Sequence, residues 1–502
     1  MTSSSNHPSV IVVGSGNAAL CAAIAAQAAG ARTLVIEKAP ETEFGGNSRY
    51  TAGAMRFTYD SGDDLAPLLD HLDDERLQRT NFGCYTSAQF LADFAKFNGG
   101  REITPQQKLL VAESRPTVNW LASHGVRFEP IYSRQAFERD GQFVFWGGLT
   151  LCANGEGDGL VLAERERFLA LGGEIKYDCE ATGLITDGGR IAGLQALHEG
   201  KHVEYPATAV VFGCGGFEAN PELREQHIGA GWSEAKVRGT RHNRGAGIAM
   251  ACAIGAAAGG WYEGCHAVPM DLHMPNYGNP EIPHIDRKNY RKISYPFGVM
   301  LNARGERFVD EGADFRNYTY AQFGKAIIEQ PGRFAWQIFD DQVTSLMYEE
   351  YWTDDASSVE TSTLEQLVAR LDGVEPETAL RTLIEYNQAV DAAVPFDPTV
   401  KDGRCTLGLT LPKSNWALAL EKPPFRAYPV TCGITFTYGG LKTSLNAEVL
   451  NDSESAIPGL FACGELVGDV FFEGYPGGSG LTSGAVFGKR AGESAARLVS
   501  AV

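Results

Sequence analysis

The first part of the sequence alternates between apolar blocks of different lengths. Residues 9–13 form a continuous apolar run of strand length, residues 17–29 are alanine-rich and favour a helix, and residues 32–36 form a second buried strand. Gly30 is suited to follow the helix because glycine readily adopts the left-handed backbone conformation of a helix end. A strand, a helix and a strand joined by short connections predict a parallel strand pair with a right-handed crossover.

Two later segments repeat the transition from a buried strand to glycine. Residues 209–216 read AVVFGCGG and residues 459–465 read GLFACGE, and the second segment is followed by a glycine-rich loop and a predicted helix at about 481–499. Two distant segments of this kind indicate that one nucleotide-binding domain is assembled from both ends of the sequence.

The middle of the sequence has a different pattern. Thr363 precedes an amphipathic stretch with Gln366 placed for a capping box, and Pro376 is suited to the first turn of a helix reaching about residue 394. Residues 395–424 are rich in proline, glycine and polar residues and predict a long return connection. We therefore expect an α/β fold in which a Rossmann-like domain (1–268 and 426–502) is split around an inserted α+β cap domain (269–425).

Composition narrows the class of protein. The 502 residues carry a net charge of −19, which argues against a nucleic-acid or anionic-membrane partner. The ten cysteines include no C-x-x-C pair and no cysteine–histidine cluster, which argues against a zinc or iron–sulfur site and for reduced thiols in the cytoplasm. The sequence starts with polar residues unlike a signal peptide, and no apolar run is long enough for a transmembrane segment.

A glycine pattern joins the first predicted strand to the first predicted helix. Gly14, Gly16 and Ala19 form G-x-G-x-x-A, in which the glycines allow a tight turn and close approach of a pyrophosphate to the helix N-terminus. Glu37 stands at the end of the second strand, where a carboxylate accepts hydrogen bonds from ribose hydroxyls. The strand, the helix and the acid together predict a dinucleotide site.

The sequence FGGNSRYTAGAMR at residues 44–56 resembles the flavin-wrapping segment of the fumarate reductase/succinate dehydrogenase flavoprotein family. The resemblance continues in order through CEATGL, the glycines after AVVFGC, NRGAG in place of a T-G-D-G turn, ACGE and GGSGLT. It implies an FAD-binding domain and, since no histidine matches a flavin-attachment position, non-covalent FAD. The cofactor-binding residues that it implies are Gly14, Gly16, Asn17, Ala18, Glu37, Lys38, Gly45, Gly46, Asn47, Ser48, Thr51, Ala52, Gly53, Ala181, Cys214, Gly215, Gly216, Asn243, Gly247, Glu465, Gly480, Leu481 and Thr482.

Several side chains that the family uses for fumarate reduction are missing. The arginine expected three positions after Glu311 is Asp314, and the F-D-D-x-x-R sequence ends on Thr344. The histidine of the H-T-M-G-G run is replaced by Phe436, and the arginine near the last glycines is replaced by Tyr475. A straightforward fumarate reductase is therefore not expected.

Tyr475 opens a Y-P-G-G sequence similar to an element of 3-ketosteroid dehydrogenases, in which the tyrosine hydroxyl and a backbone N–H, here that of Ser479, polarise a ketone oxygen. The proton-abstracting tyrosine of that branch falls at Phe315, so Arg316 is the nearest candidate, with Tyr318 and Tyr320 behind it. Runs such as SYPFG, DEGADFRNYTYA and CGITFTYGGL are similar to the tricarballylate dehydrogenase-like subgroup. These resemblances imply catalytic roles for Tyr475, Arg316, His266 and Glu311, substrate contacts from Arg291, Tyr438, Ser479 and Trp146, and no metal.

The expected function is desaturation of a small carboxylate or carbonyl compound next to its activating group, with FAD as the hydride acceptor. A tri-acid substrate would require several cations, and an external electron acceptor of unknown identity would be needed. The alternatives are a reductase of an activated C=C bond, a dehydrogenase of 3-ketosteroids or cyclic ketones, and a flavoprotein subunit that passes electrons to a partner.

Overall fold

The computed structural model describes residues 7–70, 73–145, 148–287 and 290–501. The chain divides into two compact units. Unit 1 contains residues 1–233, 239–265 and 436–502, and unit 2 contains residues 234–238 and 266–435. Each unit is described by itself below.

The central sheet of unit 1 has six strands in the order β20-β21-β13-β1-β2-β9. Five of them run parallel, and β20 pairs antiparallel at one edge. Their bounds are β20 (Glu448–Leu450), β21 (Ala456–Ala462), β13 (Ala209–Phe212), β1 (Val10–Val13), β2 (Thr33–Ile36) and β9 (Glu174–Lys176). Every residue of β1, β2 and β13 is buried, as expected for parallel strands covered on both faces. The predicted parallel pair of the first two strands is confirmed.

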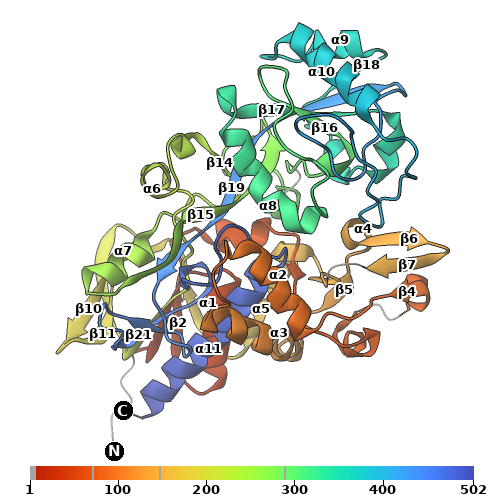
Figure 1. Ribbon diagram of the computed structural model, residues 1–502. Helices are drawn as coiled ribbons and strands as arrows, with labels where there is room; N and C mark the ends of the chain where they lie inside the picture. The colour runs from red at the N-terminus through yellow and green to blue at the C-terminus, as the bar shows by residue number, and fades with distance from the viewer. Residues whose placement is uncertain (1–6, 71–72, 146–147, 288–289, 502) are drawn as a thin grey trace, which may run out of the picture. The chain divides into compact units, whose positions relative to one another are not determined.

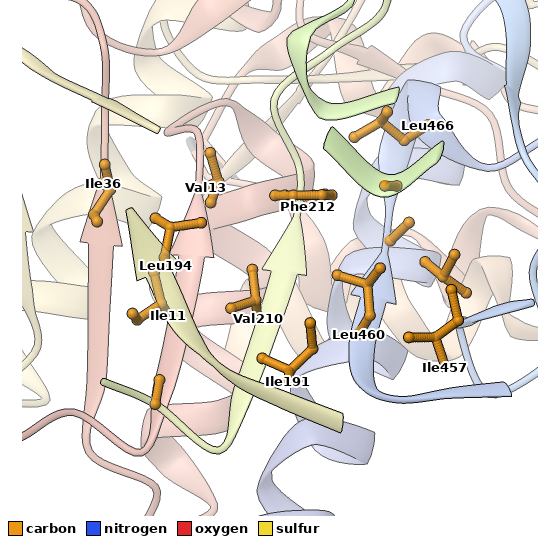
Figure 2. Close-up of a cluster of buried hydrophobic side chains, with 14 of the residues drawn as sticks. Ile11, Val13, Ile36, Ile191, Leu194, Val210, Phe212, Ile457, Leu460 and Leu466 are labelled. Atoms are coloured by element: carbon orange, nitrogen blue, oxygen red, sulfur yellow. The ribbon is translucent and has the colours of Figure 1, made fainter. Parts of the chain in front are cut away.

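A second, antiparallel sheet packs on the central one. Its strands are β10 (Cys179–Asp187), β11 (Arg190–His198) and β12 (Lys201–Pro206). Ile191 and Leu194 of β11 share one buried cluster with Ile11, Val210 and Leu460 of the central sheet, as Figure 2 shows. Their apolar contact fixes the second sheet over the strands that lead to the glycine turns.

Two helices from opposite ends of the sequence pack against each other in unit 1. These are α1 (Asn17–Ala28) and α11 (Ser479–Ser500), which confirm the helices expected in these regions (Figure 1). A Cβ atom added to Gly488 or Gly492 would lie 2.3 Å from Ala18 O or 2.1 Å from Ala22 O. Glycine at these positions therefore permits the two backbones to approach closely.

Smaller elements complete unit 1. Two three-stranded sheets contain β3 (Ala54–Met55), β8 (Leu151–Ala153) and β5 (Phe128–Pro130), and β4 (Thr80–Asn81), β7 (Gln142–Phe145) and β6 (Ala136–Arg139). The remaining helices are α2 (Ser87–Phe97), α3 (Pro105–Ser123), α4 (Tyr132–Gln135), α5 (Glu156–Ala170), α6 (Pro221–His227) and α7 (Ala246–Ala253).

The sheet of unit 2 has the order β14-β19-β17-β16, and two further strands, β15 and β18, also pair with β19. The bounds are β14 (Lys236–Val237), β15 (Ala258–Asp271), β16 (Val299–Leu301), β17 (Phe334–Phe339), β18 (Val359–Thr361) and β19 (Phe425–Leu441), and both β15 and β19 include residues of both units. The helices are α8 (Arg316–Ile328), α9 (Leu364–Val368) and α10 (Pro376–Ala389). Trp336 and Ile338 of β17 share a core with Leu367 and Leu383 of the last two helices.

The predicted helix signals of the middle region are confirmed at their start. Thr363 accepts a hydrogen bond from the Gln366 N–H at 3.2 Å, and Pro376 lies in the first turn of α10. The helix ends at Ala389 rather than near residue 394, because Val390 is extended and forms a β-bridge with Thr406. In the part of the chain that the structure describes, no helix combines the length and apolar composition needed to cross a membrane.

Candidate functional site

The turn between β1 and α1 leaves no room for side chains. Gly14 has a φ of +103°, and a Cβ atom there would lie 2.6 Å from Gly213 O. Gly16 precedes α1 and, as a glycine, has no side chain to cap the helix. Ala19 is fully buried and touches the backbone of Gly213. The predicted pattern thus forms a close backbone cradle at a helix N-terminus.

Ser15 links the predicted ribose acid to the next glycine segment. Its hydroxyl donates to Glu37 Oε2 at 2.5 Å and accepts from the Gly45 N–H at 3.0 Å. Glu37 Oε1 also accepts from the Ala39 N–H at 2.7 Å. Burial raises the pKa of Glu37, while these hydrogen bonds lower it. Ser15 was not predicted, although it is the variable residue between Gly14 and Gly16.

Residues 45–53 fold against the start of α1. Ser48 Oγ accepts from the Asn17 N–H at 3.1 Å, and Thr51 Oγ1 donates to Ser48 O at 2.8 Å. Gly53 has a φ of +63°, and a Cβ atom there would lie 2.5 Å from the Glu156 backbone. These contacts place the predicted flavin-wrapping segment next to the helix N-terminus.

The start of α11 lies beside the start of α1. Asn17 Nδ2 donates to Leu481 O at 2.8 Å, which joins the first turn of α1 to the first turn of α11. Gly478 precedes α11 with a φ of +85°, and no side chain caps this helix either. Two helix N-termini with a buried carboxylate nearby fit a dinucleotide, because N–H groups bind anionic oxygens and the carboxylate binds ribose hydroxyls. FAD would be held by these residues, and the residues present fit it.

A buried carboxyl pair connects several predicted FAD residues. Glu218 Oε1 accepts from Asn47 Nδ2 and from Asn243 Nδ2, each at 2.6 Å. Glu465 Oε1 accepts from the Thr437 N–H at 2.6 Å and from its hydroxyl at 2.9 Å. Burial raises the pKa of both carboxyl groups. Glu218 was not predicted, since nothing in the sequence GGFEAN distinguishes it from an ordinary polar residue.

Tyr475 belongs to a cluster of aromatic rings in unit 1, here called the aromatic group (Phe436, Tyr438, Phe471 and Tyr475). Phe436 and Phe471 meet the Tyr475 ring nearly edge-on, with centroid distances of 5.4 and 5.6 Å. A Cβ atom on Gly480 would lie 3.6 Å from Phe436 and 3.8 Å from Tyr475, so the group lies at the start of α11. The predicted residues Tyr475 and Tyr438 are thus brought together there.

The backbone N–H of Ser479 is engaged within its own turn. It donates to Pro476 O at 3.0 Å, and the Ser479 hydroxyl donates to the same oxygen at 2.6 Å. Ser479 is also fully buried. These contacts give no support to the predicted role of this N–H as a substrate ligand.

Arg56 supports the loop that carries Tyr475, and it was not predicted. Its side chain is fully buried, its Nε donates to Gly477 O at 2.7 Å, and its backbone N–H donates to Gly478 O at 3.2 Å. The guanidinium lies 3.5 Å from Asp93 and packs over the Tyr85 ring. Since these contacts lie directly before α11, Arg56 fixes the start of that helix.

In unit 2 one face of α8 meets β15. Residues spaced by four along a helix share a face, and Arg316, Tyr320 and Gly324 have this spacing. A Cβ atom on Gly324 would lie 2.5 Å from the Ala267 backbone, and the Tyr320 ring lies 5.1 Å from the ring of His266. The Arg316 guanidinium packs over the Tyr348 ring at 4.6 Å. The predicted residues His266 and Arg316 therefore flank Tyr320 in unit 2.

His266 has positively charged neighbours. Its pKa is lowered well below the usual histidine value by burial first, and then by the charges of Arg238 and Arg291. Arg238 N–H donates to Ile434 O at 2.8 Å, and Arg238 Nη1 donates to Thr435 Oγ1 at 3.3 Å. The neutral imidazole is thus favoured beside two cations. Arg238 was not predicted, because no motif marks it.

Two other predicted residues form buried ion pairs within unit 2. Arg291 Nη2 lies 2.6 Å from Glu350 Oε1, and Arg307 Nη2 lies 2.5 Å from Glu311 Oε2. Glu311 Oε1 accepts from the Met300 N–H at 2.8 Å and from Arg307 Nε at 3.2 Å. Both oxygens of Glu311 are thus engaged, and the predicted catalytic role gains no support from these contacts.

Other predicted cofactor residues contact neighbouring segments of unit 1. Lys38 forms a salt bridge with Glu180 at 2.7 Å, and Ala181 on β10 faces Ala196 on β11. A Cβ atom on Gly215 would lie 2.2 Å from the Asn243 side chain, and one on Gly247 would lie 2.5 Å from Cys214 Sγ. Trp146 lies outside the described residues. Among the residues that are described, no group of His, Cys, Asp or Glu could hold a metal ion.

The glycine turn, the buried acid Glu37 and the N-termini of α1 and α11 fit an FAD-binding flavoprotein. The profile of the family described as FAD binding domain matches residues 9–481, and the chain belongs to this family of FAD-dependent oxidoreductases. The chain is itself an enzyme of this oxidoreductase class.

Two curated relatives match nearly the whole chain. A probable fumarate reductase, Ifc3, of Shewanella frigidimarina is 27% identical over 97% of this chain and 74% of its own length. The 3-oxosteroid 1-dehydrogenase of Mycobacterium tuberculosis is 23% identical over 94% of this chain and 95% of its own length. The solved structure of 3-ketosteroid delta1-dehydrogenase from Sterolibacterium denitrificans has the same fold, with a TM-score of 0.73, 21% identity, and coverage of 99% of this chain and 100% of that chain.

Replacing Gly14 by alanine should sharply reduce FAD binding. The new Cβ atom would lie 2.6 Å from Gly213 O on a backbone with a φ of +103°. We expect the affinity for FAD to fall by about tenfold or more, roughly 1.4 kcal/mol. Flavin fluorescence titration of the apoprotein measures this change. Gly30→Ala is the matched control, since Gly30 has a φ of +89° with nothing within 4 Å, and its FAD affinity should stay near that of the wild type.

Proposed function

We propose that this enzyme dehydrogenates a small carboxylate or carbonyl compound at the C–C bond α,β to the activating group, with an unidentified external electron acceptor. FAD, when bound, supplies the acceptor of the hydride. The relatives named fumarate reductase and 3-oxosteroid 1-dehydrogenase support this reaction class, because their named substrates carry an activated C=C bond or a CH–CH bond next to a ketone.

The observation that carries the proposal is the position of Tyr475. Its phenol ring lies at the start of α11, edge-on to Phe436 and Phe471. A tyrosine hydroxyl in such an apolar setting is a strong hydrogen-bond donor to a developing oxyanion, since little water competes for it. Tyr475 would thus polarise the activating oxygen, which favours loss of the α proton.

In unit 2 we propose that Arg316, Arg238 and neutral His266 bind a carboxylate of the substrate. All three side chains are buried, and a carboxylate is well matched to a guanidinium fork. Arg291 is a further candidate, although its guanidinium already pairs with Glu350. The α proton would pass to Arg316 or to Tyr318 or Tyr320, which lie two and four positions further along α8.

Finer assignments rest on the sequence resemblance. We propose a substrate of the tricarballylate type, with several carboxylates, non-covalent FAD, and a cytoplasmic location in keeping with the cysteine pattern. We also propose that residues 269–425 act as the substrate-capping domain of the sequence prediction, and that the FAD-binding domain is split around them.

Anaerobic titration of the yellow protein tests the reaction class. Saturated polycarboxylates and saturated cyclic ketones are added one at a time to the oxidised protein. The unsaturated partner of each compound is added to a separate oxidised sample. A saturated compound should bleach the oxidised flavin, and its unsaturated partner should leave the oxidised spectrum unbleached. Bleaching by none of the saturated compounds, together with reoxidation of the reduced flavin by an unsaturated one, would establish the reductase direction instead.

A further inference from the structure

Glu218 holds two predicted FAD residues in place. Its side chain is fully buried, and its Oε1 accepts from the amides of both Asn47 and Asn243 at 2.6 Å. The orientation of the Asn47 amide is fixed because Asn47 Oδ1 accepts from the Thr240 N–H at 2.8 Å. One carboxyl oxygen thus sets the direction in which two asparagines present their other atoms.

The second oxygen of Glu218 requires a proton. Oε2 is buried, and among the described residues no N–H or O–H group donates to it. The carboxyl group of Glu465 is a close enough neighbour that its charge raises the pKa of Glu218. A buried oxygen without a donor costs about 1–3 kcal/mol, and a second buried negative charge beside Glu465 is unfavourable as well, so a proton on the pair is favoured.

The surroundings decide which carboxyl group keeps the proton. Glu465 Oε1 accepts from both the N–H and the hydroxyl of Thr437, and these donors stabilise its ionised form. Burial raises the pKa of Glu218 first, and the adjacent charge of Glu465 raises it further. Glu218 also accepts from two amides, but the charge of Glu465 adds to the effect of burial, so the proton is favoured on Glu218.

Few charges face this pair from the neighbouring elements. Within the described residues no Lys, Arg or His forms an ion pair with either carboxyl group. The Arg224 guanidinium donates to the main-chain oxygen of Glu218 and to Trp232 O and Ser233 O, so its hydrogen bonds go to carbonyls. The Cys214 thiol has Glu37 and Glu465 as charged neighbours, and burial raises the pKa of Cys214 to about 12. Cys214 is thus neutral, and no cation offsets a second negative charge.

We propose that Glu218 is a positioning residue for FAD that acts as a neutral acid, sharing one proton with Glu465 while it orients Asn47 and Asn243. The proton would let a carboxyl group accept from two amides without adding negative charge to a site that would hold an anionic cofactor. Because the pKa of Glu218 is raised, this proton is kept to a higher pH than that of an ordinary glutamate and is lost as the pH rises through the folded-state value. FAD binding should therefore weaken, relative to a chain without this proton, as the solution becomes alkaline.

Glu218→Gln tests the proposal, because glutamine keeps the acceptor for both asparagines and offers an N–H to Glu465. Infrared difference spectroscopy near neutral pH should show the C=O band of a buried carboxylic acid in the wild type and its loss in the variant. FAD affinity, measured by fluorescence titration of the apoprotein, should stay within about threefold of the wild type. Glu218→Ala removes the acceptor and should weaken FAD binding by about tenfold or more.

Glu164→Gln is a matched control. Glu164 is another fully buried glutamate whose pKa is raised by burial, but its hydrogen bond comes from the Cys21 thiol. It should lose its own carboxylic-acid band without removing that of Glu218. Absence of a band from Glu218, equal FAD affinity in the Gln and Ala variants, or FAD binding that strengthens with pH relative to Glu218→Gln would each overturn the proposal.

Discussion

Tyr475→Phe should slow reduction of the bound flavin by substrate by about 10²–10³-fold, the loss typical of removing one donor to a developing oxyanion. The substitution keeps the ring that packs edge-on against Phe436 and Phe471 and removes only the hydroxyl. FAD should remain bound, because the proposed cofactor-binding residues of α1 and of residues 45–53 are unchanged. Anaerobic stopped-flow mixing with a substrate found by titration measures the rate.

Tyr438→Phe is the companion variant. Tyr438 belongs to the same aromatic group and is almost fully buried, so it controls for loss of a hydroxyl from that group. Its limiting reduction rate should stay within about fivefold of the wild type. Any larger change should appear in the substrate concentration that gives half of the limiting rate. Equal limiting rates for Tyr475→Phe and the wild type would remove Tyr475 from the reaction.

Glu311→Ala should destabilise unit 2 by about 3–5 kcal/mol, since it leaves a buried guanidinium without its partner. The Arg307 guanidinium meets both carboxylate oxygens of Glu311, and the Met300 N–H loses its acceptor as well. Chemical denaturation followed by circular dichroism should show an earlier transition than in the wild type.

Glu306→Ala provides the comparison for that variant. Glu306 lies in the same segment but is exposed, and its removal should change the free energy of unfolding by no more than about 0.5 kcal/mol. If Glu311→Ala instead kept the wild-type denaturation midpoint and lost only turnover, the residue would be catalytic rather than structural.

Local sequence patterns predicted the nucleotide-binding part of the fold well. The parallel pair of β1 and β2, the helix between them and the glycine at the turn follow from periodicity and backbone conformation, which are properties of neighbouring residues. The same holds for the cap of α9 and the start of α10. The end of α10 was misplaced, because a bridge from Val390 to Thr406 competes with the helix.

The residues that were missed depend on partners far away in the sequence. Arg56 bonds to Gly477, which lies 421 positions further on, and Glu218 bonds to Asn47, which lies 171 positions before it. A single sequence contains no signal for such pairs, since neither an isolated arginine nor an isolated glutamate has a motif. Conversely, Ser479 fits a motif, but its N–H donates to Pro476 O because the local turn brings the two groups together.

The contact between α1 and α11 has a consequence for biosynthesis. Asn17 bonds to Leu481 O, and Gly488 and Gly492 of α11 press on the backbone of α1. During translation the ribosome releases α1 long before α11, so the nascent chain carries an alanine-rich helix whose glycine-matched partner does not yet exist. We therefore expect FAD to be captured only after α11 has been made, because until then α1 lacks the helix that packs against it.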